Sequence, residues 1–248
     1  MPTKISSFTA WLILSLPLYL LFFTSCDAFY DEGDWVTEVR KTEDFYRVNV
    51  KAVADVFYKY SDSTYVEVNF YRKHLSDIKL SAADEILTIE STFSAQWYTD
   101  IQKPVITIYS PGFSHLFVET AAGFYCVDTL KHSRFLFQVV GDLYETQLLV
   151  DVSLLEISIE SASGLAEVDG NMDVLNVLNR GESKIDASRI SVPKVIVRQE
   201  SYLDVWFHAS QIFNYEIRRG GDIHLYGTPE IEGTVYGNGK LIYYGEGK

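Results

Sequence analysis

A short motif that recurs about every 20 residues constrains this chain more than any other feature of its sequence. It consists of an apolar residue, a small residue four positions later and a second apolar residue two positions after that. Successive small residues are 18, 20, 18, 20, 22 and 19 positions apart, counted back from the C-terminal side. The small residues are Gly239, Gly221, Ser201, Ser183, Ser163, Gly141 and Ala122. The apolar residues after them are Leu241, Ile223, Leu203, Ile185, Leu165, Leu143 and Phe124, and those before them are Val235, Ile217, Val197, Ile159, Phe137 and Val118, with Asn179 as the exception.

This period predicts a solenoid in which each repeat forms one coil. A small residue suits a corner where the backbone bends or is closely approached, and the flanking apolar residues then face a shared interior. An aromatic content of 15% with only 6 prolines also favours strands. We therefore predict an all-β, right-handed parallel β-helix, a single domain over residues 41–248 with regular coils at about 116–245. A β-sandwich with closely spaced turns is the alternative.

The N-terminal half is less regular and predicts a partly antiparallel region. The stretch VADVFYKYSDSTYVEVNF, residues 53–70, alternates apolar and polar residues around Ser61-Asp62-Ser63 and is typical of a β-hairpin. EILTIES at 85–91 and PVITIYS at 104–110 predict short strands. We expect this half to begin the stack of coils and to cover its exposed edge.

The first residues resemble an export signal. Lys4 precedes an apolar stretch from Trp11 to Phe23, which is too short for a comfortable membrane span. FTSC, ending at Cys26, resembles the bacterial lipobox, so we predict a signal peptide at 1–25, lipidation of Cys26 and an acidic tether at 26–40. Cleavage of an ordinary secretory signal after Ala28 is the alternative. An acylated Cys26 would leave Cys126 as a buried free thiol.

The net charge and the motifs that are missing from the sequence limit the function. A net charge of -13 argues against a nucleic-acid partner, which requires clustered Lys and Arg. The sequence contains no HExxH, paired CxxC, P-loop or GxSxG motif, so we expect no cofactor and no dedicated zinc or nucleotide chemistry.

The repeat aligns two sets of residues that a solenoid could bring together. Arg180, Arg198 and Arg218 each follow the first apolar position, and such a basic column could hold an acidic glycan or phosphate. Alternatively, Glu182 and Glu200 neutralise it as ordinary surface ion pairs.

The second set follows the second apolar position. Asp186, Asp204 and His224 would lie on neighbouring coils, where stacked carboxylates could bind a metal or perform acid–base catalysis. A solvated outer face is the alternative interpretation.

The stretch GGDIHLYGTPEIEGTVYGNGKLIYYG, residues 220–245, together with coils such as SLLEISIESASGLAEV, resembles the family "putative auto-transporter adhesin, head GIN domain". The resemblance runs from about Phe45 to Tyr244. It implies a parallel β-helix on the cell envelope, a role in adhesion and no agreed catalytic residues.

We therefore predict a secreted, lipid-anchored protein that is an adhesion or binding scaffold and not an enzyme. Its expected partners are a glycan or protein at the envelope and, through the anchor, the membrane. Its expected place is the outer membrane, facing the periplasm or the cell surface. A carbohydrate-active β-helix enzyme that cleaves polysaccharide, or a purely structural envelope component, are the alternatives.

Overall fold

The computed structural model describes residues 33–93 and 102–246. Residues Trp35–Lys248 form one compact unit, which holds every described strand. The predicted signal peptide, Cys26 and the first part of the predicted tether lie outside the described residues. Within the described part of the chain, no helix has the length and apolar character needed to cross a membrane.

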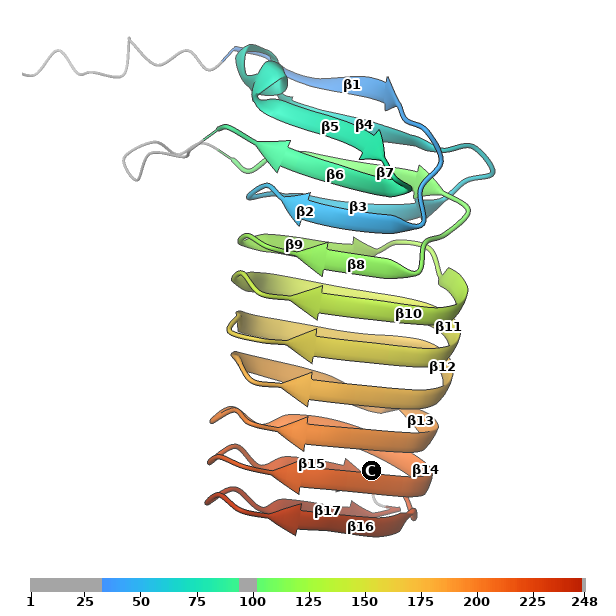
Figure 1. Ribbon diagram of the computed structural model, residues 1–248, viewed down its shortest axis with the longest axis vertical. Coiled ribbons are helices and arrows are strands. Elements are labelled where there is room, and N and C mark those ends of the chain that lie inside the picture. The colour runs from blue at the N-terminus through green and yellow to red at the C-terminus, as the bar shows by residue number, and fades with distance from the viewer. Residues whose placement is uncertain (1–32, 94–101, 247–248) are drawn as a thin grey trace, which may run out of the picture. The chain divides into compact units, whose positions relative to one another are not determined.

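The C-terminal half of the chain forms a stack of parallel coils, so the predicted β-solenoid is confirmed (Figure 1). Each coil contributes one strand segment to each of two facing walls and pairs in parallel with the coil before it and the coil after it. The strands are β8 (His115–Val118), β9 (Ala122–Cys126), β10 (Leu130–Val139), β11 (Leu143–Ile159), β12 (Ser163–Asn179), β13 (Glu182–Gln199), β14 (Val205–Ile217), β15 (Ile223–Tyr226), β16 (Glu230–Val235) and β17 (Leu241–Gly245).

Inward-facing residues of successive coils form columns that run along the solenoid. The column predicted from the apolar residues before the small ones is wrong at Phe137 and Val197. Val139 and Gln199, two residues later in the chain, occupy these positions. The column predicted from the apolar residues after the small ones is wrong at three positions. The residues in this column are Thr146, Ala166 and Val205 instead of Leu143, Leu165 and Leu203. Coils differ in the number of residues at their corners, and a bulge interrupts the register between Leu143 and Thr146. A fixed motif cannot follow these changes.

The tight corner between the two walls explains the small residues of the motif. A Cβ atom at Gly221 would lie 2.3 Å from the carbonyl oxygen of Leu203, one coil earlier, so only glycine permits this approach. Asn179, which breaks the apolar pattern, is fully buried and donates a 2.9 Å hydrogen bond from Nδ2 to the carbonyl of Ser183. Gln199 stacks next to it and donates likewise to Leu203, at 2.5 Å. The side-chain amides of Asn179 and Gln199 thereby fix the backbone of their corners.

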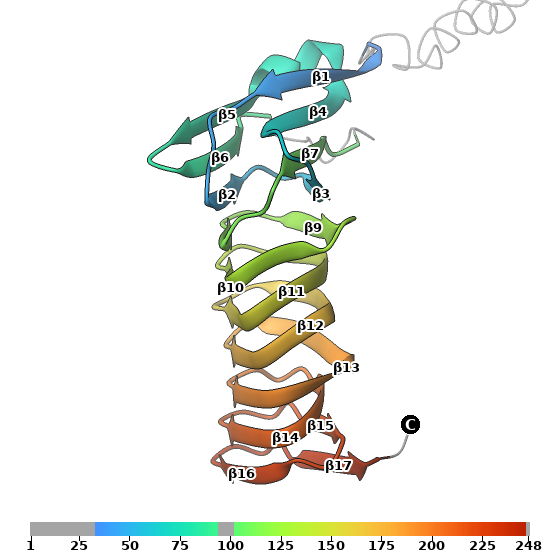
Figure 2. The same cartoon turned by 90° about the vertical axis from the view of Figure 1, so that its right-hand side faces the viewer.

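The N-terminal region is partly antiparallel, as predicted, but its strands are not stacked in chain order. Its elements are β1 (Trp35–Lys41), β2 (Arg47–Lys51), β3 (Asp55–Tyr60), β4 (Tyr65–Tyr71), the 3₁₀ helix η2 (Arg72–Asp77), β5 (Ile78–Ala83), β6 (Ile86–Ser91) and β7 (Val105–Ser110). The coil made of β2 and β3 lies between the later coils β6–β7 and β8–β9, and pairs in parallel with both (Figure 2).

The predicted hairpin over residues 53–70 is wrong, because β7 inserts between its two arms. β7 pairs in parallel with β3 and antiparallel with β4. The alternating pattern correctly marks two strands, but the pairing partner arrives about 40 residues later in the chain. Apolar alternation shows which face of a strand is buried and does not show which strand lies beside it.

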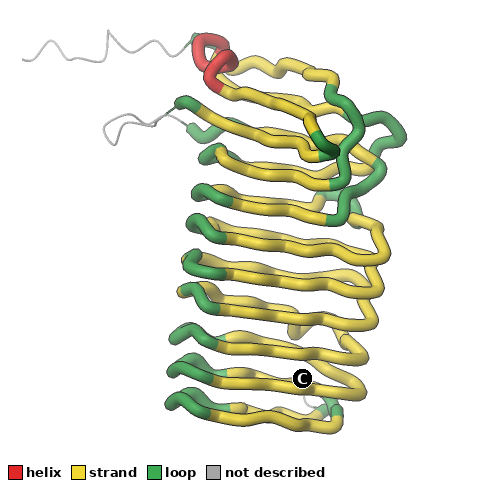
Figure 3. The backbone as a smooth tube through the Cα atoms, in the orientation of Figure 1, coloured by secondary structure: helices red, strands yellow, loops and turns green. Residues whose placement is uncertain are grey.

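Antiparallel strands close this end of the solenoid. β1 pairs with β4 and β5 pairs with β6, while η2 joins β4 to β5 at the end of the stack (Figure 3). The rings of Trp35 and Phe93 pack edge-on against Phe70, at centroid distances of 5.8 and 5.2 Å. Residues 35–40, which we expected in the tether, belong to β1 and therefore to the folded unit.

Candidate functional site

The predicted basic column is replaced by a network in which every arginine contacts glutamates. Asn179, Gln199 and Ile217 lie side by side in parallel register on three coils. The next residue in each coil therefore falls in one column, in which Glu200 lies between Arg180 and Arg218. Arg198 lies in the adjacent column, opposite Glu216. The prediction of three arginines in one column is therefore wrong, because the coil that carries Arg198 has a longer corner.

The acidic partners are Glu160, Glu200 and Glu216, in place of the Glu182 that we expected. Arg198 Nε lies 2.9 Å from Glu200 and 3.1 Å from Glu216. The other contacts are Arg180 to Glu160 at 3.1 Å and to Glu200 at 3.5 Å, and Arg218 to Glu216 at 2.8 Å and to Glu200 at 3.8 Å. The hydrogen bond with Glu160 raises the pKa of Arg180, and that with Glu216 raises the pKa of Arg218. Three positive charges are thus matched by three negative charges, which favours the ion-pair interpretation.

Asp186 and Asp204 are not stacked, so the predicted carboxylate pair does not form. Asp186 pairs in register with Trp206, and Trp206 with His224. Asp186 Oδ1 accepts hydrogen bonds from the backbone and side chain of Ser188, at 2.9 and 2.7 Å. Asp204 Oδ1 accepts from the amide of Asp222 at 2.9 Å and thereby caps the tight corner. Both carboxylates have structural partners.

His224 belongs to an aromatic ladder that the sequence analysis missed. Its ring stacks between Trp206, at 5.0 Å, and Tyr244, at 5.8 Å, with interplanar angles of 11°. Its Nδ1 lies 2.9 Å from the Tyr244 hydroxyl and its Nε2 lies 3.4 Å from Asp204 Oδ2. Parallel register explains the stacking of Trp206 on His224, because equivalent side chains on adjacent coils are about 4.8 Å apart, which is close to ring-stacking distance. Tyr244 is not the register partner of His224 and joins the ladder from a bulge in β17.

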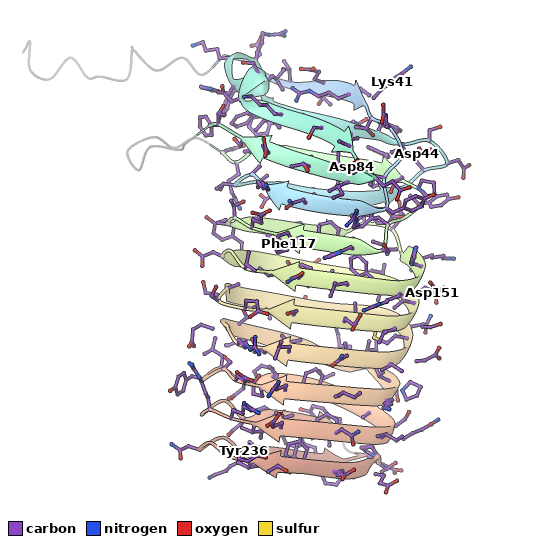
Figure 4. The ribbon with its side chains drawn as sticks, viewed as in Figure 1. Lys41, Asp44, Asp84, Phe117, Asp151 and Tyr236 are labelled. Carbon is purple, nitrogen blue, oxygen red and sulfur yellow. The ribbon has the colours of Figure 1, made fainter. Side chains whose placement is uncertain are left out.

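A large groove runs along the outside of the wide corner, at the opposite side from the tight one. It has a volume of about 910 Å³ and lies where β10 to β13 bend from one wall to the other. Figure 4 shows Asp151 at this corner and Tyr236 at the tight one. The polar residues that line this corner groove are Lys131, His132, Asp151, Ser153, Asn171, Asp173 and Ser191, and the apolar ones are Val152, Met172, Ile190, Val192 and Pro193.

The polar side chains of the corner groove have hydrogen-bonding capacity that the described residues do not use. Lys131, Asp151 and Asn171 lie side by side in parallel register on three coils. Their side chains, and that of Asp173, have no hydrogen-bond or ion-pair partner among the described residues. This distinguishes the groove from the arginine–glutamate network. A strict spacing of 20 residues through Lys131, Asp151, Asn171 and Ser191 was the sequence signal for it.

Glycine shapes the floor of the corner groove. Gly170 has a φ of +109°, and a Cβ atom there would lie 1.9 Å from the carbonyl oxygen of Val150 on the previous coil. Any side chain would force the two coils apart. The close approach keeps Asp151 and Asn171 at coil spacing.

The described residues offer little for metal or thiol chemistry. No group of three His, Cys, Asp or Glu side chains in this part of the chain is arranged to hold a metal ion. Cys126 is a free thiol, as predicted, but the residue is partly exposed and not fully buried. Desolvation of the thiol raises its pKa to about 12. At neutral pH it is protonated and therefore a poor nucleophile.

The fold and the corner groove define the class of this protein: a β-solenoid with an open lateral groove. The chain belongs to the family described as "putative auto-transporter adhesin, head GIN domain", whose sequence profile matches residues 44–229. The predicted family resemblance is therefore confirmed. A search of curated proteins gives no match.

Solved structures of low sequence identity share the fold. A "putative adhesin" from Bacteroides fragilis has a TM-score of 0.77 at 18% identity, over 85% of this chain and 97% of that chain. A "putative lipid binding protein" from Parabacteroides distasonis has a TM-score of 0.63 at 19% identity, over 86% and 97%. A "putative adhesin" from Parabacteroides merdae has a TM-score of 0.59 at 18% identity, over the same shares.

Proposed function

We propose that this protein is a secreted, lipid-anchored envelope protein that binds a hydroxyl-rich glycan without cleaving it, as an adhesion scaffold. The observation that supports the glycan is the row of unpartnered polar side chains in the corner groove. The Lys131 ammonium group donates hydrogen bonds, the carboxylates of Asp151 and Asp173 accept them, and the Asn171 amide does both. Together these groups complement sugar hydroxyls, which both donate and accept hydrogen bonds. Ile190 and Pro193, which are partly exposed, offer apolar contacts for the C–H faces of sugar rings.

The charge of the corner groove favours a neutral glycan over an acidic one. Lys131 contributes one positive charge, and Asp151 and Asp173 contribute two negative charges. An anionic ligand would have to approach these carboxylates within a chain of net charge -13. The arginines that could have attracted an acidic ligand are already paired with glutamates.

A glycan panel tests this function with a matched set of variants. The double variant Asp151→Ala/Asn171→Ala removes two side chains from the centre of the groove, each of which contributes about 1 kcal/mol as a hydrogen-bonding group. We expect binding of neutral oligosaccharides to fall by about tenfold or more. Lys184→Ala, on an exposed position of β13, is the control and should bind like the wild type. Equal binding by both variants contradicts the site, and release of new reducing ends contradicts the non-enzymatic role.

The lipid anchor is tested separately, at the cysteine that follows the export signal. Cys26→Ala removes the acylation site, so this variant should partition into the aqueous phase of a detergent extraction or stay unprocessed. The wild type should partition into detergent, because several acyl chains hold a protein stably in a membrane. Unchanged partitioning of the variant would show that Cys26 is not the anchor.

A further inference from the structure

The last coil differs from all those before it because one of its sides is uncovered in the described residues. β16 pairs only with β14, and β17 only with β15. As a result, Ile231, Val235 and Tyr243, which occupy inward-facing columns, are 37%, 44% and 48% exposed. The residues one coil earlier in these columns, Phe213, Ile217 and Leu225, are each 0% exposed. This end of the solenoid is therefore an unpaired sheet edge next to exposed core residues, and such an edge tends strongly to associate.

We propose that a second copy of this chain covers this end, so that two solenoids join tail to tail about a twofold axis. In this dimer β16 pairs antiparallel with the partner's β16, and β17 pairs antiparallel with the partner's β17. The backbone groups of both edges are then satisfied, and the exposed core residues of the two copies are buried against each other. A twofold interface closes on itself and leads to a dimer instead of a fibre.

The sequence of β16 is self-complementary in one register, with Gly233 on the twofold axis. In this register Ile231 lies opposite the partner's Val235, and both side chains face the interior. Glu232 lies opposite the partner's Thr234, so no acidic residue of β16 faces its own copy. A shift by one residue would place inward-facing residues opposite outward-facing ones and would expose the apolar side chains again.

In β17 the axis falls on Tyr243, which then lies opposite the partner's Tyr243. The strand is regular only as far as this residue, because a bulge follows at Tyr244 and Gly245 has a φ of +66°. The strand itself, LIYYG, contains no charged residue that would discourage pairing.

One axis serves both strands. Gly233 and Tyr243 are each five residues from Asn238, in the middle of the tight corner, so they lie at matching distances from the bend on opposite walls. An axis that passes through both residues crosses the interior between the walls.

The opposite end of the solenoid is not suited to receive this edge. It is closed by antiparallel β1 and β4, and β1 carries the exposed residues Glu38 and Lys41. Charged residues on an edge strand oppose further pairing. Head-to-tail stacking is thus disfavoured, which leaves the self-complementary end to pair with itself.

Cysteine cross-linking tests the axis in the full chain. Tyr243→Cys places two thiols across the twofold axis, at a Cα separation of about 5 Å that suits a disulfide. Val235→Cys is the matched control, since it is exposed to a similar degree at the same end. Its thiol would lie about 14 Å from its own copy, four residues along an antiparallel pair.

We expect a covalent dimer for Tyr243→Cys on a non-reducing gel after mild oxidation, and none for Val235→Cys or for the wild type. Equal cross-linking of the two variants would overturn the register. In light scattering, the unmodified chain should have twice its monomer mass. A chain that is monomeric at about 100 µM would overturn the proposal, whether its own residues or nothing cover the end. A dimer with a dissociation constant above about 100 µM has less than about 5.5 kcal/mol of association free energy.

Discussion

The regular coils and the N-terminal region are built from strands of similar composition, yet they follow different rules of assembly. From β8 onward, each coil packs on the coil that precedes it in the chain. Before β8, coil β2–β3 is enclosed by two later coils, and antiparallel strands complete the end. The coils depend on contacts between successive repeats, whereas the N-terminal region depends on contacts across long stretches of chain.

The difference has a physical cause in the ends of a solenoid. A coil inside the stack has a neighbour on each side, and identical repeats can continue without limit. The first coil needs a cover, and only strands of another kind can provide one. Phe113 lies where the two regions meet, fully buried, with the rings of Tyr58, Phe124 and Phe135 packed against it at 5.6, 6.3 and 5.8 Å. The two regions therefore share one core, although the strands around it are assembled by different rules.

The largest effect should come from a charge inside the regular coils. Ile223→Asp buries an unpaired carboxylate at a position that is 0% exposed, and should destabilise the fold by about 4–5 kcal/mol or more. Thermal unfolding should begin with the C-terminal coils, while the N-terminal region stays protected from hydrogen exchange. Lys184→Ala, on an exposed position, should change the free energy of unfolding by no more than about 0.5 kcal/mol. Equal effects of the two substitutions would contradict the assignment of inside and outside.

Two phenylalanine truncations compare the regions directly. Phe70 in β4 and Phe137 in β10 are both 0% exposed, so each change to alanine should cost about 3–5 kcal/mol. The locations of the damage should differ. Phe70→Ala should increase hydrogen exchange in β1 and β4, whereas Phe137→Ala should increase it in the coils on both sides of β10. The same exchange pattern for both variants would mean that the two regions unfold as one unit.

A smaller effect is expected at the tight corner. Asn179→Leu leaves the carbonyl of Ser183 without its buried donor, which should cost about 1–3 kcal/mol. Asn176→Leu, on an exposed position of the same strand, is the control and should be close to neutral. Chemical denaturation of both variants measures the difference. If Asn179→Leu were as stable as the wild type, its hydrogen bond could not be what holds the corner.

The smallest effect should come from the arginine–glutamate network on the outer face of the coils. Arg198→Ala removes two contacts with glutamates at partly exposed positions, where ion pairs contribute about 0–1 kcal/mol. The melting temperature should fall by no more than a few degrees, and by less at high salt. A large, salt-independent loss would show that Arg198 stabilises the coils through packing instead of charge.

The sequence identifies the architecture well and the columns only in part. The period of about 20 residues is visible because every coil repeats the same sequence of wall, corner and wall. It places Ile185, Ile223 and Leu241 correctly in one column, as the strand register shows. It fails at Leu203, because the wide corner of β13, between Ala187 and Lys194, contains additional residues whose number no local pattern reveals. This error wrongly placed Asp186 in one column with Asp204, and Arg198 in one column with the other two arginines.

For the corner groove and the aromatic ladder, too, the sequence contains the spacing of the residues but not their surroundings. Lys131, Asp151 and Asn171 are 20 residues apart, and Trp206 and His224 are 18 apart, so both sets follow the coil period. Their spacing could have been read from the sequence. That the first set lines a groove without partners could not, because this depends on which side chains the corner brings together.

By itself, the sequence determined that this protein is a β-solenoid with a different N-terminal region, since repeated apolar and small residues can only be buried by stacking coils. Only the tertiary structure decided the order of the first coils, in which β2–β3 lies between β6–β7 and β8–β9. It also decided which charges meet on the outer face. Pairing between strands is made by backbone hydrogen bonds that every residue except proline can form, so the side chains indicate that a strand exists and the complete fold selects its neighbour.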